Sequence, residues 1–188
     1  MTLRRSIPNF VTMLNLFSGS VAVLFAVNGN MKITAIFVFL GIFFDFFDGL
    51  LARKLNVQSD LGIQLDSLAD LVTSGVVPGI VMFYLLGLST NTGWESSYLC
   101  QPFHIEGTNF IPFIGLLVIL ASAYRLAKFN LDEDQQDHFM GLPTPANTLL
   151  IVSLPLIMEY QDNDLMNTII LNKWFLIGLT LLSCYLLN

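Results

Sequence analysis

Long hydrophobic runs separated by short polar connections dominate the sequence. Six runs have the length and the scarcity of charge that a helix needs to cross a bilayer whose apolar core is about 30 Å thick. They cover residues 7–27, 33–51, 63–88, 110–128, 146–160 and 168–187. Because a helix satisfies its own backbone hydrogen bonds in lipid, we expect an all-α, polytopic transmembrane helix bundle of about six spans.

The composition favours a chain that is surrounded by lipid. Of its 188 residues, 54% are hydrophobic and 12% are charged, whereas an average soluble domain has about 25% charged residues. The mean hydropathy is +0.69. We therefore expect a multi-pass integral membrane protein with a single domain over residues 1–188. The last run reaches the chain terminus without a cap or a polar tail, a pattern consistent with C-terminal truncation.

The basic residues indicate how the bundle is oriented, because Lys and Arg tend to stay on the cytoplasmic side. Six of the eight lie at the N-terminus, in the second connection or at the end of the fourth run: Arg4, Arg5, Arg53, Lys54, Arg125 and Lys128. Only Lys32 and Lys173 lie on the other side. This distribution predicts that both termini and the second connection face the cytoplasm.

Aspartates are concentrated where the second run ends and the third begins. Asp45 and Asp48 are three residues apart, and Asp66 and Asp70 are four apart, so each pair projects from one face of its helix. Ionisable residues within membrane segments are costly and indicate function. A short basic connection folds the second helix back beside the first, so we expect all four carboxylates to meet. The net charge of −6 is thus largely local, and we expect no nucleic-acid partner.

Four carboxylates in a small volume repel one another unless a cation lies among them. Oxygen ligands without nearby His or Cys favour Mg²⁺ or Mn²⁺, with Ca²⁺ as a further candidate, over zinc. The number of carboxylate ligands, four, predicts two ions.

Small residues lie beside the aspartates. At about 100° per residue, Gly49 and Ala52 share a face with the first pair, and Gly62 lies near the face of the second. Small side chains leave room for a bulky group to approach the metal, and Arg53 is placed to pair with a phosphate. The alternative is that these residues only allow close helix packing.

The complete segment carries a resemblance to a known family. It reads Asp45-x2-Asp48-Gly49-x2-Ala52-Arg53-x8-Gly62-x3-Asp66-x3-Asp70. These eight identities at these spacings resemble the signature of the CDP-alcohol phosphotransferases. The resemblance implies that Asp45, Asp48 and Asp66 bind metal, and that Asp70 is the catalytic base and also touches a metal. It further implies a homodimer whose CDP site is lined by Gly49, Ala52, Arg53 and Gly62.

Further motifs resemble the membrane-spanning phosphatidylserine synthases (CDP-diacylglycerol–serine O-phosphatidyltransferases) of bacterial and archaeal type. These motifs are residues 7–9 with Thr12 and Asn15, then residues 65–70, 123–130 and 141–146. Asn9 and Thr12 are candidates for nucleotide contact, although they lie where a helix start would use them as caps. Arg125 and Lys128 are candidates for binding the lipid phosphate or the serine carboxylate, although a cytoplasmic helix end is basic in any case.

The resemblance implies transfer of a phosphatidyl group from CDP-diacylglycerol to L-serine, giving phosphatidylserine and CMP. A sister enzyme with glycerol 3-phosphate or an inositol phosphate as acceptor is an alternative, but phosphorylated acceptors call for more basic residues. A membrane prenyltransferase would leave the Gly-x2-Ala-Arg element unexplained. A divalent-cation transporter is the non-enzymatic alternative, although its acidic residues would lie nearer the bilayer midplane on broken helices.

Overall fold

Helices make up every regular element in the part of the chain that the computed structural model describes. It describes residues 3–55, 57, 59–90, 110–131, 141–161 and 163–188, with side chains from residue 7 onward. The helices are α1 (Leu3–Val27), α2 (Met31–Lys54), α3 (Asp60–Asp70), α4 (Val77–Ser89), α5 (Leu117–Leu131), α6 (Thr144–Tyr160), α7 (Asp164–Ile170) and α8 (Lys173–Leu187). A π-helical turn, η1 (Leu71–Val76), joins α3 to α4, and a 3₁₀ turn, η3 (Ile111–Leu116), leads into α5.

Several of these helices can cross a membrane. Four stretches are long and apolar enough, namely Ile7–Val27, Met31–Lys54, Asp60–Ser89 and Ile111–Leu131. The bent pair α7 and α8, which meet at 57°, is a fifth candidate. Helix α6 has 17 residues, the short end of the range of about 17–25 residues for a membrane helix. The expected all-α, multi-pass architecture is confirmed, with a number of spans close to six.

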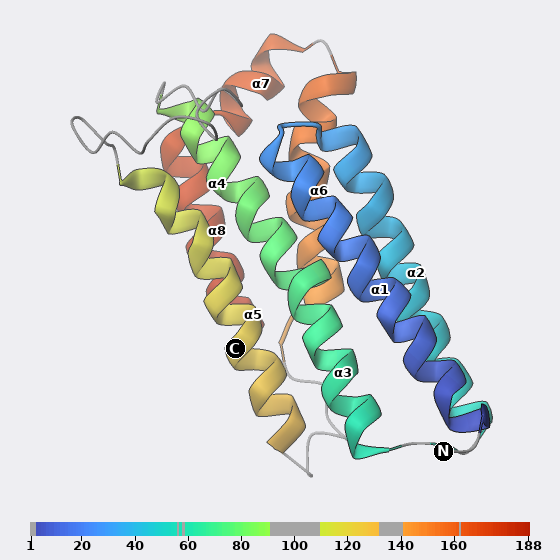
Figure 1. The fold of residues 1–188 in the computed structure, drawn as a ribbon. Coiled ribbons are helices and arrows are strands. Elements are labelled where there is room, and N and C mark those ends of the chain that lie inside the picture. Colours follow the sequence, from blue (N-terminus) through green and yellow to red (C-terminus); the bar gives the residue numbers. More distant parts are fainter. Residues whose placement is uncertain (1–2, 56, 58, 91–109, 132–140, 162) are drawn as a thin grey trace, which may run out of the picture.

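The long helices run side by side through the bundle (Figure 1). Helices α1 and α2 form an antiparallel pair, and the continuous stretch of α3, η1 and α4 packs beside α1. Helix α5 lies on the other side of that stretch, and α6 packs against both α2 and α4. The start of α1 lies at the same end of the bundle as the end of α2 and the start of α3 (Figure 1). We call this the α2–α3 end.

The interior changes character along the bundle. Away from the α2–α3 end, the core is apolar and includes Ala26, Val38, Val81 and Leu85, which are fully buried. Toward the α2–α3 end, buried polar side chains concentrate, among them Thr12, Asn15, Asp48, Thr73 and Asn147. Polar groups inside a membrane protein need hydrogen-bond partners or a ligand. A functional site is therefore expected in the polar half of the interior.

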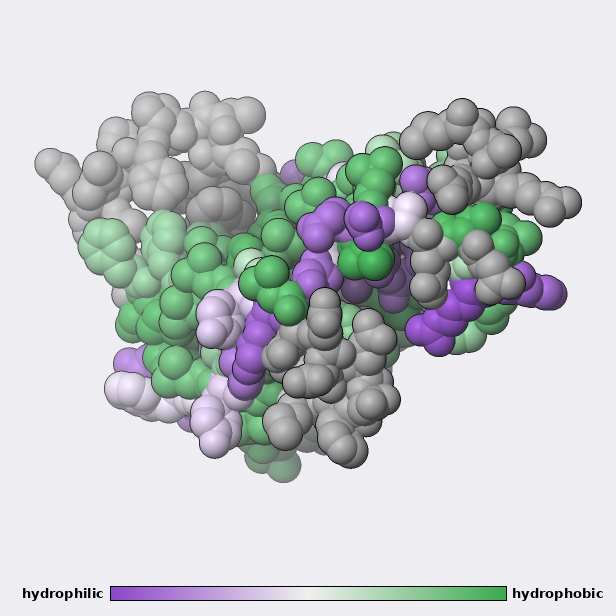
Figure 2. Space-filling view, turned by 90° about the horizontal axis from the view of Figure 1, so that it is seen from below, coloured by the Kyte–Doolittle hydropathy of each residue, from purple (hydrophilic) through white to green (hydrophobic). Residues whose placement is uncertain are grey.

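The outer surface is rich in large hydrophobic side chains. Phe10, Phe17, Phe46 and Leu120 are each at least 64% exposed, whereas soluble monomers rarely expose extended apolar surface. Seen from the α2–α3 end, hydrophilic residues cross the middle of the molecule between hydrophobic flanks (Figure 2). Lipid is the solvent that suits such a surface.

Two features differ from the helices expected from the sequence. The run 168–187 is not one helix, because Asn172 begins a new one, its side-chain oxygen accepting a hydrogen bond from the backbone N–H of Trp174 at 3.0 Å. The run 63–88 is continuous but contains η1, whose wider turn has no signature in the hydrophobic pattern.

Candidate active site

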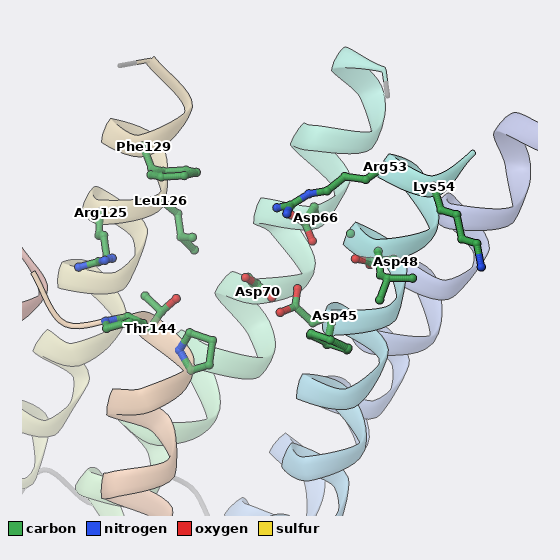
Figure 3. A pocket seen from close by; sticks show the side chains of 15 residues that line it. Asp45, Asp48, Arg53, Lys54, Asp66, Asp70, Arg125, Leu126, Phe129 and Thr144 are labelled. Carbon is green, nitrogen blue, oxygen red and sulfur yellow. The ribbon is translucent and has the colours of Figure 1, made fainter. Parts of the chain in front are cut away.

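The aspartates of α2 and α3 converge as their spacing predicts. Asp45 and Asp48 project from α2, and Asp66 and Asp70 project from α3 toward them (Figure 3). One carboxylate oxygen each from Asp45, Asp48 and Asp66 lies within 4.8 Å of the other two. The connection between the helices is short, since α2 ends at Lys54 and α3 begins at Asp60. This hairpin places the two acidic faces opposite each other.

The chemistry of this carboxylate group fits a divalent cation. Asp48 is 4% exposed, and both its Oδ2 and the Oδ1 of Asp66 are buried without a hydrogen-bond partner among the described residues. Oxygens bound to one ion at about 2.0–2.6 Å can lie up to about twice that distance apart, so the observed spacing suits a shared ion. Buried carboxylate oxygens without donors are otherwise strongly unfavourable. The three residues therefore fit a metal of the Mg²⁺ class.

Asp70 is held differently from the other three aspartates. Its Oδ1 accepts a hydrogen bond of 3.2 Å from Nδ2 of Asn15 on α1. It does not belong to the group of three whose oxygens lie within 4.8 Å of one another. It still faces the same space and lies across from Asp45 (Figure 3). Asp70 is thus near the candidate metal site but is positioned by a neighbouring helix.

A pocket of about 860 Å³ opens beside the aspartates. Helices α2 and α3 form one wall, and α5 with the start of α6 forms the other (Figure 3). Its lining residues are Asp45, Phe46, Asp48, Gly49, Leu50, Arg53, Lys54, Asp66, Asp70, Arg125, Leu126, Phe129, Pro143, Thr144 and Pro145. Four carboxyl groups, three basic side chains and several apolar ones share this space, which is the mixture that a charged group attached to a lipid requires.

The small residues near the aspartates have separate roles. Gly49 lines the pocket, and a Cβ added there would meet nothing within 4 Å. Gly62 does not line it, and a Cβ added at Gly62 would lie 3.2 Å from Ser59 Oγ and 3.3 Å from Asn9 Oδ1. Ala52 is also absent from the lining. Gly49 therefore leaves open space, whereas Gly62 allows α3 to approach α1.

Arg53 lies in the last turn of α2, beside the aspartates. It lines the pocket, and its side chain extends toward Asp66, whereas Lys54 points away (Figure 3). The guanidinium is exposed, so it is accessible to a phosphate that approaches the aspartates from the pocket.

Asn9 and Thr12 do not cap α1. The helix begins at Leu3, six residues before Asn9, so the capping alternative is wrong. Thr12 is buried, and its hydroxyl donates to the carbonyl oxygen of Pro8 at 3.1 Å. Neither residue is among those that line the pocket. Their nucleotide contact stays a prediction.

Arg125 and Lys128 have different surroundings, although they are only one helical turn apart on α5. Arg125 lines the pocket, and its Nη1 donates to the carbonyl oxygen of Leu187 at 2.7 Å. Lys128 is exposed and is not a lining residue. One guanidinium nitrogen of Arg125 is therefore engaged by α8, which holds the group at the pocket wall.

Sequence reasoning did not identify the wall formed by α5 and α6 in full. Leu126, Phe129, Pro143, Thr144 and Pro145 line the pocket but were not candidates. All five lie in or beside the motifs 123–130 and 141–146, so those motifs were the available signal. Gly141, with φ of +89°, gives the turn before α6 a backbone conformation that favours glycine.

Comparison with known proteins shows the family of this chain. The profile of the CDP-alcohol phosphatidyltransferase family matches residues 5–184. The chain is 36% identical over 152 residues to a CDP-diacylglycerol–serine O-phosphatidyltransferase of Bacillus subtilis, covering 79% of this chain and 74% of that protein. It is 32% identical over 179 residues to one of Methanocaldococcus jannaschii, covering 95% and 71%. An archaetidylserine synthase of Methanothermobacter thermautotrophicus is 28% identical over 160 residues, covering 84% and 60%.

The match extends well beyond the aspartate segment and includes the helices that form both walls of the pocket. The resemblance found in the sequence is thereby confirmed, and the chain belongs to the CDP-alcohol phosphatidyltransferase family.

Proposed function

We propose that this protein transfers the phosphatidyl group of CDP-diacylglycerol to L-serine, producing phosphatidylserine and CMP. One observation carries the proposal: three carboxylates, two of which have a buried oxygen without a hydrogen-bond partner, converge beside a large pocket in a bundle with a lipid-compatible surface. The names of the similar proteins from Bacillus subtilis and Methanocaldococcus jannaschii support this donor and this acceptor. A site at the end of a membrane bundle suits a lipid donor and a water-soluble acceptor.

Asp45, Asp48 and Asp66 would hold Mg²⁺ or Mn²⁺, and Asp70 would touch a metal as well. We propose two ions, supported by the number of carboxylates, and the described residues that line the pocket include no His or Cys that would favour zinc. When bound, the ions supply positive charge that stabilises the diphosphate and the departing CMP.

The remaining chemistry belongs to the side chains. Asp70 takes the proton from the serine hydroxyl, whose oxygen forms a bond to the phosphorus that bears the diacylglycerol. The bond from that phosphorus to the bridging oxygen breaks, and CMP leaves with that oxygen. The proposed acceptor-binding groups are Arg125, which lines the pocket, and Lys128, which lies one turn further along α5.

We propose that the nucleotide contacts Gly49, Ala52, Arg53, Gly62, Asn9 and Thr12. The pocket supports two of these directly, since Gly49 offers open space and Arg53 offers a positive charge. A Cβ added at Gly62 on α3 would lie 3.3 Å from Asn9 Oδ1 on α1, so the contribution of these two residues would come through the position of the α3 N-terminus.

We also propose that the site opens to the cytoplasm, that residues 1–188 form one domain, and that the protein is a homodimer. The orientation rests on Arg53, Lys54, Arg125 and Lys128, which lie toward the C-terminal ends of α2 and α5, while Lys32 and Lys173 lie at the starts of α2 and α8. Single cysteines at Lys54→Cys and Lys173→Cys in a cysteine-free background test the orientation in intact cells. An impermeant thiol reagent should label only the second. Crosslinking in native membranes tests the dimer.

The function is tested with purified protein, CDP-diacylglycerol, Mg²⁺ or Mn²⁺, and a panel of labelled alcohols. We expect CMP release that depends on serine and stops when EDTA removes the metal. CMP release with glycerol 3-phosphate or an inositol phosphate instead would assign a different acceptor. No release with any alcohol, together with metal flux across liposomes, would favour transport and refute the proposal.

A further inference from the structure

A chain of hydrogen bonds runs from Thr73 through Asn15 to Asp70. Asn15 on α1 is fully buried, and its Nδ2 donates to Asp70 Oδ1 at 3.2 Å. The hydroxyl of Thr73 donates to Asn15 Oδ1 at 2.8 Å. Thr73 is itself 1% exposed. The three side chains thus link η1, α1 and α3 directly behind the aspartate site.

The chemistry of the groups fixes the direction of this chain. A carboxylate only accepts hydrogen bonds, so the amide NH₂ of Asn15 has to face Asp70. The amide oxygen then faces Thr73, whose hydroxyl has to donate. Losing the Thr73 hydroxyl would leave the amide oxygen without a donor in a buried site and would free the amide to rotate.

Two glycines provide the space for this arrangement. A Cβ at Gly41 on α2 would lie 2.6 Å from Thr73 Cγ2 and 3.0 Å from Asn15 Oδ1. A Cβ at Gly19 on α1 would overlap the Thr73 side chain and lie 3.1 Å from its Cα. Three helices therefore close around Thr73 and Asn15, which excludes water from the pair.

The backbone changes geometry at the same place. Thr73 lies in η1, which begins immediately after Asp70. Single π-helical turns inside α-helices occur frequently at functional sites. Here the turn holds Thr73 at the α1 interface while Asp70 still reaches the pocket.

We propose that Asn15 is a positioning residue that fixes the Asp70 carboxylate, and that Thr73 in turn fixes the amide of Asn15. One carboxylate oxygen is held by α1, so the other is directed to the pocket. The inference rests on the proposed role of Asp70 as the base. It also separates Asn15 from the motif residues Asn9 and Thr12, which make no such contact with Asp70.

Two substitutions at Thr73 separate positioning from packing. Thr73→Val keeps the shape of the side chain but removes the hydroxyl, whereas Thr73→Ser keeps the hydroxyl but removes the methyl that lies against Gly41. If the residue only packs, Val should retain activity and Ser should lose it. If it positions Asn15, the order is reversed.

For the positioning role we expect Thr73→Val to lower kcat by about 10- to 100-fold, as loss of a supporting hydrogen bond near a metal site typically does. The KM for CDP-diacylglycerol and the Mn²⁺ affinity should stay within about twofold of wild type. Thr73→Ser should keep most of kcat. An active Val variant beside an impaired Ser variant would overturn the proposal.

A second readout does not need turnover. The side-chain amide signals of asparagine can be followed by NMR in protein that carries ¹⁵N-labelled asparagine. The signal that is present in the wild type and missing in Asn15→Ala belongs to Asn15. We expect this signal to shift in Thr73→Val and in Asp70→Ala, and to stay in place in Thr73→Ser. An unchanged signal in the first two variants would refute the hydrogen-bond chain. If the wild type released no CMP with any alcohol, the proposed function would fail, while this spectrum would still decide the role of Asn15.

Discussion

Arg125 on α5 donates a hydrogen bond from Nη1 to the backbone carbonyl oxygen of Leu187 on α8, at 2.7 Å. The same guanidinium lines the pocket, so one side chain both joins two helices and presents charge to a ligand. A lysine cannot do both, because it is a point charge without the planar fork of donors.

We therefore expect Arg125→Lys to raise the KM for serine by roughly 10- to 100-fold, the equivalent of one hydrogen bond to a charged group. The KM for CDP-diacylglycerol should change little. Initial rates of CMP release at varied serine concentration provide the measurement. Lys173→Gln is the matched control, because Lys173 is exposed, begins α8 and lies outside the pocket lining. A lower thermal stability with an unchanged KM for serine would limit Arg125 to the α5–α8 contact.

The three converging carboxylates should act together in metal binding. Asp48→Asn and Asp66→Asn each replace a charged ligand by a neutral one, so we expect Mn²⁺ affinity to fall at least about tenfold and turnover to be lost. Electron paramagnetic resonance of free Mn²⁺ during a titration reports the affinity. Asp60→Asn is the control, because Asp60 begins α3, is exposed and lies outside the pocket lining. Equal Mn²⁺ affinity in all three variants would contradict the assignment of these ligands.

Asp70 should differ from this group in its response to the same substitution. Asp70→Asn removes the base but leaves the close set formed by Asp45, Asp48 and Asp66. We expect turnover to be abolished while Mn²⁺ affinity remains within about tenfold of wild type. Full CMP release by this variant would refute the role of Asp70 as base.

Gly49 and Gly62 offer a matched test of open space against helix contact. Gly49→Leu would extend into the pocket without meeting a neighbour at its Cβ, so we expect normal thermal stability and weaker binding of CDP. Gly62→Leu would displace Ser59 and Asn9, and overpacking of this kind costs about 1–3 kcal/mol. Thermal denaturation in detergent and CDP binding by calorimetry measure the two effects. A Gly49→Leu variant that binds CDP normally would remove this residue from the nucleotide site.

The sequence predicted the convergence of the aspartates because the information is local. Spacings of three and four residues place Asp45 and Asp48 on one helix face, and Asp66 and Asp70 on another. Because the connection between α2 and α3 is short, the two helices pack side by side. No comparable rule relates α3 to α5, which are separated by more than 40 residues. The opposite wall, including Thr144, depends on how distant helices pack, and one chain's hydrophobic pattern does not encode that.

Helix continuity was the other limit of prediction. In an apolar run, nothing in the periodicity distinguishes a π-helical turn at Leu71–Val76 from regular α-helix. The break before α8 had a local signal in Asn172, a good N-cap residue, but hydropathy alone favoured one long segment. The π-helical turn η1, which the sequence did not predict, begins directly after Asp70. This agrees with the general rule that departures from regular secondary structure are concentrated at functional sites.

The π-helical turn also sets the rotational register between the two ends of one transmembrane segment. If all six residues of Leu71–Val76 adopted regular α-helical geometry instead, everything beyond them would rotate by about 100° relative to everything before them, because the wider turn accommodates one extra residue. Asp66 and Asp70 could then keep facing α2 only if Val81 and Leu85 left the apolar core, where both are fully buried. The extra residue thus allows one continuous helix to present its acidic half and its apolar half in directions that an unbroken α-helix could not combine.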